Sequence, residues 1–140
     1  MKSQELAKEY KDYVINMRRE FHMNPEPSLQ EYETSKKIKN ELEKDGIECE
    51  IVADTGVVAT IRGAHSGKTV ALRGDIDALA VIEQTGKEYA SKVHGLMHAC
   101  GHDGHTAIGL TTARILMELK DKLHGTLKII FQPAEEGVRG

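Results

Sequence analysis

The fold is decided by residues 98–131, which read HACGHDGHTAIGLTTARILMELKDKLHGTLKIIF. Their first eight residues hold three imidazoles, a thiol and a carboxylate, with glycines that let the backbone turn tightly. Residues 106–120 then show a helical pattern that is apolar on most sides, which predicts a helix packed between a sheet and another layer. Gly125 precedes a short apolar strand over 126–131. The stretch therefore predicts a layered α/β domain with polar groups gathered at one end of a buried helix.

The residues upstream add helices and strands of the same kind. Apolar side chains at spacings of three and four predict a helix over 4–21. Ser28 followed by Glu31 is a capping-box pattern, which predicts a second helix over 29–44 that ends at Gly46. Short β-branched segments separated by turns predict strands over 47–52, 57–61 and 69–73. This alternation favours α/β layers around a largely buried sheet.

Composition excludes several classes of protein. The 140 residues, 39% of them hydrophobic, suffice for one domain with a single core. The formal charge of −3, with Lys and Arg scattered among Asp and Glu, argues against a basic face for nucleic acid, and no apolar run reaches the ~20 residues of a membrane span. The N-terminus lacks the apolar stretch of a signal peptide, and the two cysteines, Cys49 and Cys100, lie far apart. We therefore expect a cytoplasmic protein without a disulfide and without nucleic-acid or membrane partners.

The histidine-rich cluster has the composition of a metal site. Cys100 and His102 are two residues apart, and in an extended segment both would point to the same side. A thiolate and an imidazole suit zinc, cobalt or manganese better than calcium or magnesium. We interpret His98, Asp103 and His105 as supporting residues: His98 orients the loop, His105 lines the site or caps the next helix, and Asp103 fixes an imidazole tautomer.

Two pairs of carboxylates follow predicted strands, where sites in α/β sheets collect. Asp75 and Asp77 follow the strand over 69–73, and Asp77 is placed to hold the second ring nitrogen of a metal-binding histidine. Glu135 and Glu136 follow the last strand and would point in opposite directions in an extended chain. One would then bind metal while the other moves protons, as hydrolysis requires. The alternative for both pairs is a solvated turn.

Several motifs together carry a family pattern. They are Arg18-Arg19-Glu20-Phe21-His22 with Asn24-Pro25-Glu26, Asp75-Ile76-Asp77-Ala78-Leu79, the stretch 97–106, and Gln132-Pro133-Ala134-Glu135-Glu136-Gly137. In order and spacing they resemble metallopeptidase family twenty, in its amidohydrolase branch of N-acyl amino acid hydrolases. The resemblance covers essentially the whole sequence, and its Cys-Gly-His-Asp-Gly-His element is highly specific.

The resemblance implies a role for each residue of the predicted site. Cys100, His102 and Glu136 correspond to ligands of two divalent ions, manganese or zinc. Glu135 corresponds to the general base that deprotonates the attacking water, and Asp77 to the supporting acid beside the metals. At Asp75 the sequence departs from the peptidase relatives, which carry a metal-binding histidine there.

The resemblance also implies a larger protein. Residues 1–140 would form the N-terminal part of a mixed-sheet αβα catalytic domain of the zinc-peptidase type. A lid or dimerisation domain, the C-terminal part of the catalytic domain and further histidine ligands would lie outside this sequence. We expect a homodimer or hetero-oligomer as the parent enzyme, and an inactive protein if these residues stand alone.

The substrate implied is an N-acyl amino acid. Ala80 and the stretch 137–140 resemble the p-aminobenzoyl-glutamate hydrolases of the same branch, which suggests p-aminobenzoyl-glutamate as one such substrate. Two alternatives stay open. The parent is a hydrolase of another N-acyl amino acid or peptide in the same family, or the residues form a non-catalytic metal-binding module. A closed structural zinc site usually takes four protein ligands, often thiolates. The cluster holds only one cysteine, which disfavours such a closed thiolate site.

Overall fold

The computed structural model describes residues 2–137, which build one mixed sheet covered by helices. None of the helices in this range has the length and apolarity needed to cross a membrane. The helices are α1 (Lys2–Glu9), α2 (Lys11–Met23), α3 (Tyr32–Lys44), α4 (His102–Glu118) and the short 3-10 helix η1 (Lys120–Lys122). The strands are β1 (Glu48–Val52), β2 (Gly56–Arg62), β3 (His65–Asp75) and β4 (His124–Gln132).

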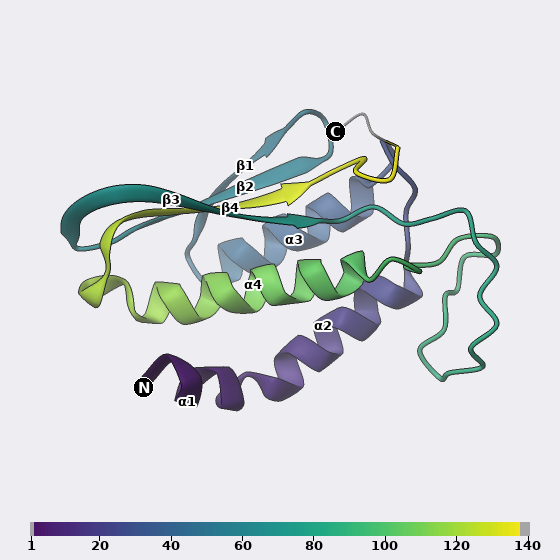
Figure 1. Ribbon diagram of the computed structural model, residues 1–140, viewed down its shortest axis with the longest axis horizontal. Helices are drawn as coiled ribbons and strands as arrows, with labels where there is room; N and C mark the ends of the chain where they lie inside the picture. Colours follow the sequence, from purple (N-terminus) through teal and green to yellow (C-terminus); the bar gives the residue numbers. More distant parts are fainter. Residues whose placement is uncertain (1, 138–140) are drawn as a thin grey trace.

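The sheet has the strand order β1-β2-β4-β3 and contains both antiparallel and parallel pairs. β2 pairs antiparallel with β1 and with β4, whereas β3 pairs parallel with β4, with Asp75 opposite Gln132. Figure 1 shows α3 and α4 beneath the sheet and α2 beneath α4. Within residues 2–137 the helices cover one face only, and Val70 and Leu72 of β3 are 61% and 41% exposed. The prediction of a largely buried sheet therefore holds for the face that the helices cover.

Helix α4 occupies the middle layer, as its apolar composition predicts. Ala107, Leu110 and Ala113 are buried and belong to the same core cluster as Ile129 and Phe131 of β4. The predicted strands are all present, and β3 is longer than predicted. α4 begins four residues earlier than the predicted 106, so the helix itself contains His102.

Close packing between α4 and β4 makes Gly109 a sensitive position. A Cβ atom at Gly109 would lie 2.8 Å from the Phe131 ring, which is buried and cannot swing away. We expect Gly109→Ala to lower the free energy of unfolding by about 1–3 kcal/mol in urea titrations. Gly104→Ala in the same helix is the control, because its Cβ would meet no atom within 4 Å. Equal stability of the two variants would contradict this packing.

The helix predicted over 4–21 is divided at Tyr10, which separates α1 from α2. Tyr10 has φ −86° and ψ 11°, and its hydroxyl hydrogen-bonds Glu118 of α4. Arg114 of α4 lies over the Tyr10 ring, with 5.5 Å between its guanidinium carbon and the ring centroid. Contacts with a distant helix thus divide a segment whose local pattern is continuous.

The capping-box prediction for the second helix is wrong. Helix α3 begins after Glu31, without a side-chain cap from that residue. The capping carboxylate belongs to Glu26, which accepts a 2.5 Å hydrogen bond from the backbone N–H of Thr34. The Ser28 hydroxyl instead donates to Asp77, at 2.7 Å. Both residues of the predicted capping box are engaged with the end of the sheet.

Candidate metal centre

The predicted site residues converge where β3 and β4 end. Because these strands are parallel, their carboxyl ends share one edge, and α4 begins at the same edge (Figure 1). Asp75 and Asp77 lie at and after the end of β3, and Glu135 and Glu136 follow β4. The prediction that polar residues gather at strand ends is confirmed.

His102 is buried, 2% exposed, with a defined orientation. Its Nδ1 lies 2.9 Å from the backbone oxygen of Asp77 and 3.2 Å from Asp77 Oδ1. Two acceptors at Nδ1 place the ring proton there and leave the lone pair on Nε2. Nε2 faces Glu135 Oε2 and Glu136 Oε1, each at 3.8 Å. The ring is therefore oriented as a metal-binding histidine requires.

Asp77 organises this end of the sheet. It is buried, and its Oδ2 accepts hydrogen bonds from the Ser28 hydroxyl at 2.7 Å and from the Glu136 backbone N–H at 2.9 Å. Together with its contact to His102, one carboxylate ties α4, the segment before α3 and the turn after β4. The contact predicted between Asp77 and an imidazole is present.

Donor atoms of Cys100, His102 and Glu136 lie within 4.8 Å of one another. Among the described residues, Glu136 Oε1 is buried and meets no hydrogen-bond partner, which is costly for a carboxylate without a cation. Hydrogen bonding to Glu136, then burial and the nearby carboxylates, raises the pKa of the Cys100 thiol. A bound cation reverses this effect and favours the thiolate. The sulfur, nitrogen and oxygen donors therefore fit a divalent transition-metal ion.

The turn at Gly101, and not an extended chain, brings Cys100 and His102 together. Gly101 has φ +85°, a left-handed conformation that glycine adopts without a steric penalty, and α4 starts at the next residue. The premise of an extended segment is wrong because the helix begins earlier than predicted. The predicted closeness of the two donors is nevertheless observed.

Asp75, His102 and His105 form a second group with donor atoms within 4.8 Å. Asp75 Oδ1 accepts from Arg73 Nε at 3.0 Å, and Asp75 Oδ2 lies 3.6 Å from His105 Nδ1. The His105 ring stacks on that of His102, with centroids 5.2 Å apart. Of the two roles predicted for His105, the structure places it beside the site.

The two glutamates sit in a turn and not in an extended chain. The turn is held by Glu31, a fully buried residue whose Oε1 accepts from the Ala134 backbone N–H at 2.8 Å. Ala134 has φ +52°, so the backbone bends sharply before Glu135. Consequently Glu135 and Glu136 both face His102. Sequence reasoning missed this role of Glu31, because no local pattern separates it from a surface glutamate.

Asp103 holds an imidazole, but not one of the metal cluster. Its Oδ2 lies 2.7 Å from His22 Nδ1 and 2.7 Å from Arg18 Nε, both on α2. His22 Nε2 in turn lies 3.1 Å from Glu83 Oε1 on the loop before Cys100. We call Arg18, His22, Glu83 and Asp103 the α2 network. It attaches Asp103, the residue after His102, to α2, which is remote in sequence. The spacing of residues within the histidine-rich cluster does not reveal this contact.

The α2 network gives a pH-dependent contribution to stability. Burial opposes ionisation of Glu83, but hydrogen bonds from the Ser91 amide, the Thr85 hydroxyl and His22 lower its pKa from 4.5 to about 2. A depressed folded-state pKa stabilises the fold above pH 4.5, and this contribution is lost as the pH falls towards 2. We expect Glu83→Gln to lower the free energy of unfolding by about 1–3 kcal/mol at pH 7, with the difference from wild type shrinking towards pH 2.

Urea titrations at several pH values would test this expectation. Glu88→Gln is the control, because Glu88 is exposed and pairs with Arg19 at 3.3 Å. A difference between Glu83→Gln and wild type that stays constant from pH 7 to pH 2 would contradict it.

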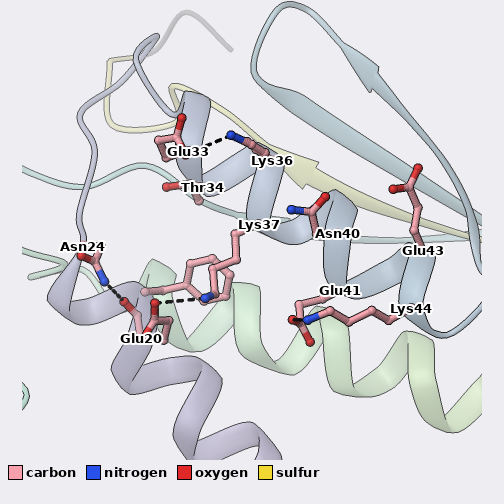
Figure 2. Close-up of a pocket in the computed structure, with 11 residues that line it drawn as sticks. Glu20, Asn24, Glu33, Thr34, Lys36, Lys37, Asn40, Glu41, Glu43 and Lys44 are labelled. Carbon is pink, nitrogen blue, oxygen red and sulfur yellow. Dashed lines mark hydrogen bonds and ion pairs between the residues drawn. The ribbon is translucent and has the colours of Figure 1, made fainter.

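A cavity of about 860 Å³ lies between α2 and α3, apart from the metal cluster (Figure 2). Its lysines are paired with glutamates: Lys37 with Glu20 at 3.0 Å, and Lys44 with Glu41 at 2.6 Å. This groove therefore presents compensated surface charges and not a set of converging donors.

Comparison with known proteins agrees with this geometry. The sequence profile of peptidase family M20/M25/M40 matches residues 71–140, half of the chain. The chain belongs to this family. Every predicted metal ligand and supporting carboxylate lies in the matched segment, whereas Ser28, His22 and Glu31 lie before it. In this member of the M20/M25/M40 family, α2 and the segment between α2 and α3 thus hold residues of the matched segment in place.

Individual relatives cover the chain almost completely. The N-acetylcysteine deacetylase of Bacillus subtilis is 52% identical over 91% of this chain and 34% of its own length. The Bacillus subtilis YXEP protein, a dinuclear metal-binding peptidase of family M20, superimposes with a TM-score of 0.91 at 50% identity, over 95% of this chain and 38% of that one. An aminobenzoyl-glutamate utilization protein of Klebsiella pneumoniae gives a TM-score of 0.76 at 27% identity, over 98% and 40%.

The superposition with YXEP confirms the predicted mixed-sheet α/β fold of this M20/M25/M40 chain. The chain spans about a third of the length of the curated relatives it matches.

Proposed function

We propose that residues 1–140 are the N-terminal part of the catalytic domain of a two-metal amidohydrolase that cleaves the amide bond of N-acyl amino acids. A single observation carries the proposal. The buried, unpartnered Glu136 Oε1 lies 3.8 Å from Nε2 of the oriented His102, and Cys100 shares their donor cluster, while Glu135 Oε2 lies 3.8 Å from the same His102 Nε2. Three ligands and a neighbouring free carboxylate are the parts that metal-assisted hydrolysis needs.

Each residue has a separate task in this proposal. Cys100, His102 and Glu136 hold metal, and Asp77 orients His102. When bound, divalent ions supply Lewis acidity and lower the pKa of water. The Glu136 backbone N–H is held by a hydrogen bond to Asp77, whereas the Glu135 side chain is half-exposed. It is therefore free to accept the proton of the attacking water and to deliver it to the leaving amine.

The proposed substrate class is supported by the names of the relatives, and the proposed metals are supported by the donor atoms of the cluster. The relative named N-acetylcysteine deacetylase supports an N-acyl amino acid as substrate, and p-aminobenzoyl-glutamate belongs to the same class with support from a relative of lower identity. The Cys100 thiolate favours zinc, while the carboxylates also accept manganese. Both cysteines are free thiols, in keeping with a cytoplasmic protein. We propose that the rest of the full-length protein supplies the remaining metal ligands, the lid domain and the contacts between subunits.

Metal content is the direct test. The chain dialysed against zinc or manganese should retain about one ion, lost in Cys100→Ser and in His102→Ala. Cys49→Ser and His94→Ala are matched controls that should retain it, since neither residue belongs to the cluster. The full-length protein should then hydrolyse N-acetyl amino acids or p-aminobenzoyl-glutamate. Metal binding without any amide hydrolysis would favour a non-catalytic module instead.

A further inference from the structure

Between β3 and α4, residues 76–101 form a long loop that contains no helix or strand (Figure 1). Loops of more than about 15 residues are uncommon in compact domains and usually have a function. A bridge between Leu79 and Met97 folds this loop back on itself, so that Glu83 and Cys100 line one cavity. Cys100 lies at the end of the loop, and the position of its thiol therefore depends on what holds the loop in place.

The loop is held by the C-terminal part of α2. His22 is 2% exposed, and its Nε2 lies 3.1 Å from Glu83 Oε1. The Tyr89 ring packs edge-on against the His22 ring, with 5.8 Å between the ring centroids. The backbone N–H of Lys92 donates to the backbone oxygen of Met23 at 2.9 Å. The loop is thus attached to α2 at three points, and the ring of His22 takes part in two of them.

The second ring nitrogen of His22 contacts the start of α4. His22 Nδ1 lies 2.7 Å from Asp103 Oδ2, and Asp103 Oδ1 accepts from the backbone N–H of Gly104 at 2.9 Å. One imidazole therefore joins the loop before Cys100 to the first turn of the helix that follows. Hydrogen bonds weaken steeply when their geometry is distorted, so a ring engaged at both nitrogens restricts how the two segments lie. Burying charged groups is costly, and we therefore expect the main effect of this arrangement to be on geometry.

We propose that His22 is a positioning residue that fixes the separation between the Cys100 thiol and the His102 ring. It acts through two carboxylates, Glu83 on the loop and Asp103 on α4. The proposal rests on the proposed function for the assignment of Cys100 and His102 as metal ligands. The turn between these two residues exists without metal, so its rigidity can be measured in metal-free protein. This inference can therefore fail while the ligand assignment stands, and the reverse is also true.

Two conservative substitutions separate the two halves of the bridge. The amide nitrogen of His22→Asn lies close to the position of Nδ1 and retains a donor for Asp103, whereas that of His22→Gln lies close to Nε2 and retains a donor for Glu83. Each variant keeps one buried carboxylate hydrogen-bonded, so we expect both to fold. Neither side chain spans the two carboxylates, so we expect both variants to loosen the turn.

Hydrogen exchange in the metal-free, full-length protein measures the turn directly. The backbone N–H groups of Gly104 and His105 donate to the Gly101 oxygen at 2.9 and 3.2 Å, so their exchange reports opening of this turn. Relative to the amides of β2, we expect at least tenfold faster exchange in both His22 variants. Leu42→Ala, in the core on α3, is the control and should lower the urea midpoint without changing this ratio. If either His22 variant behaves as Leu42→Ala does, the proposal is overturned.

Cobalt(II) in place of zinc gives a second readout, because a thiolate bound to cobalt absorbs in the near ultraviolet. We expect this absorption, per bound cobalt, to be at least threefold weaker in both His22 variants and unchanged in Leu42→Ala. Cys100→Ser assigns the band. Absorption that survives Cys100→Ser would count against Cys100 as a ligand, and hydrogen exchange would still decide the role of His22. Cys100-dependent absorption at wild-type strength in both His22 variants would overturn the positioning role.

A third variant leaves His22 in place. Glu83→Gln should speed exchange at the turn at least threefold, and adding it to His22→Asn should change the rate less than twofold, because the contact between them is already lost. Glu88→Gln, an exposed acid on the same loop, is the matched control and should have no effect alone or in combination. Fully additive effects of Glu83→Gln and His22→Asn would contradict a bridge through His22.

Discussion

Glu135→Gln in the full-length protein is expected to lower kcat by about 10²- to 10⁴-fold while the bound metal stays unchanged. Glutamine keeps the size of the side chain but cannot accept a proton from water. The proposed ligands His102 and Glu136 should keep their orientation, because their hydrogen bonds are made to Asp77 and not to Glu135. Steady-state kinetics beside metal analysis would measure both quantities on the same sample.

The neighbouring position supplies the control. Glu136→Gln is expected to lose metal as well as activity, since the Glu136 carboxylate belongs to the donor cluster. The two adjacent variants should therefore differ in metal content and agree in inactivity. Wild-type turnover by the Glu135→Gln variant would show that Glu135 is not the general base.

Asp77→Asn is expected to weaken zinc binding by about 10- to 100-fold. The Asp77 carboxylate contacts His102 Nδ1 and accepts from Ser28 and from the Glu136 backbone N–H. An amide of the same shape has one acceptor oxygen in place of two and no charge, so it cannot maintain all of these contacts. Both His102 and Glu136 would lose part of their orientation.

Isothermal titration of zinc into the chain would measure this effect. Asp54→Asn, in the exposed turn between β1 and β2, is the matched control and should bind zinc as the wild type does. Unchanged zinc affinity in Asp77→Asn would show that its hydrogen bonds do not position the ligands.

Local patterns were sufficient for the elements and for the position of the site. Strands and helices were predicted within a few residues because periodicity reports burial directly. Asp77 and Glu136 were both predicted to lie at strand ends, where sites in α/β sheets collect, and the structure brings them into contact. These inferences needed only chain order and the rule for strand ends.

The parts that were missed depend on contacts between distant segments. The break at Tyr10 arises from Glu118, and the cap of α3 comes from Glu26. Glu31 is buried because the turn at Ala134 needs an acceptor. For Tyr10 and Glu31 the partner lies more than 100 residues away in the sequence, so the local neighbourhood carries no signal. Glu26 lies only eight residues from Thr34, outside the spacing of a capping box.

The pairing of β3 with β4 has a consequence for how the protein matures. Asp75 lies opposite Gln132, so the donor groups meet only after the chain has emerged from the ribosome beyond β4 and closed a long loop. Closing such a non-local pair is slow compared with forming α2 or α3. A nascent chain therefore carries Cys100 and His102 before Glu136 joins them, so the proposed donor set is complete only after β4 has paired.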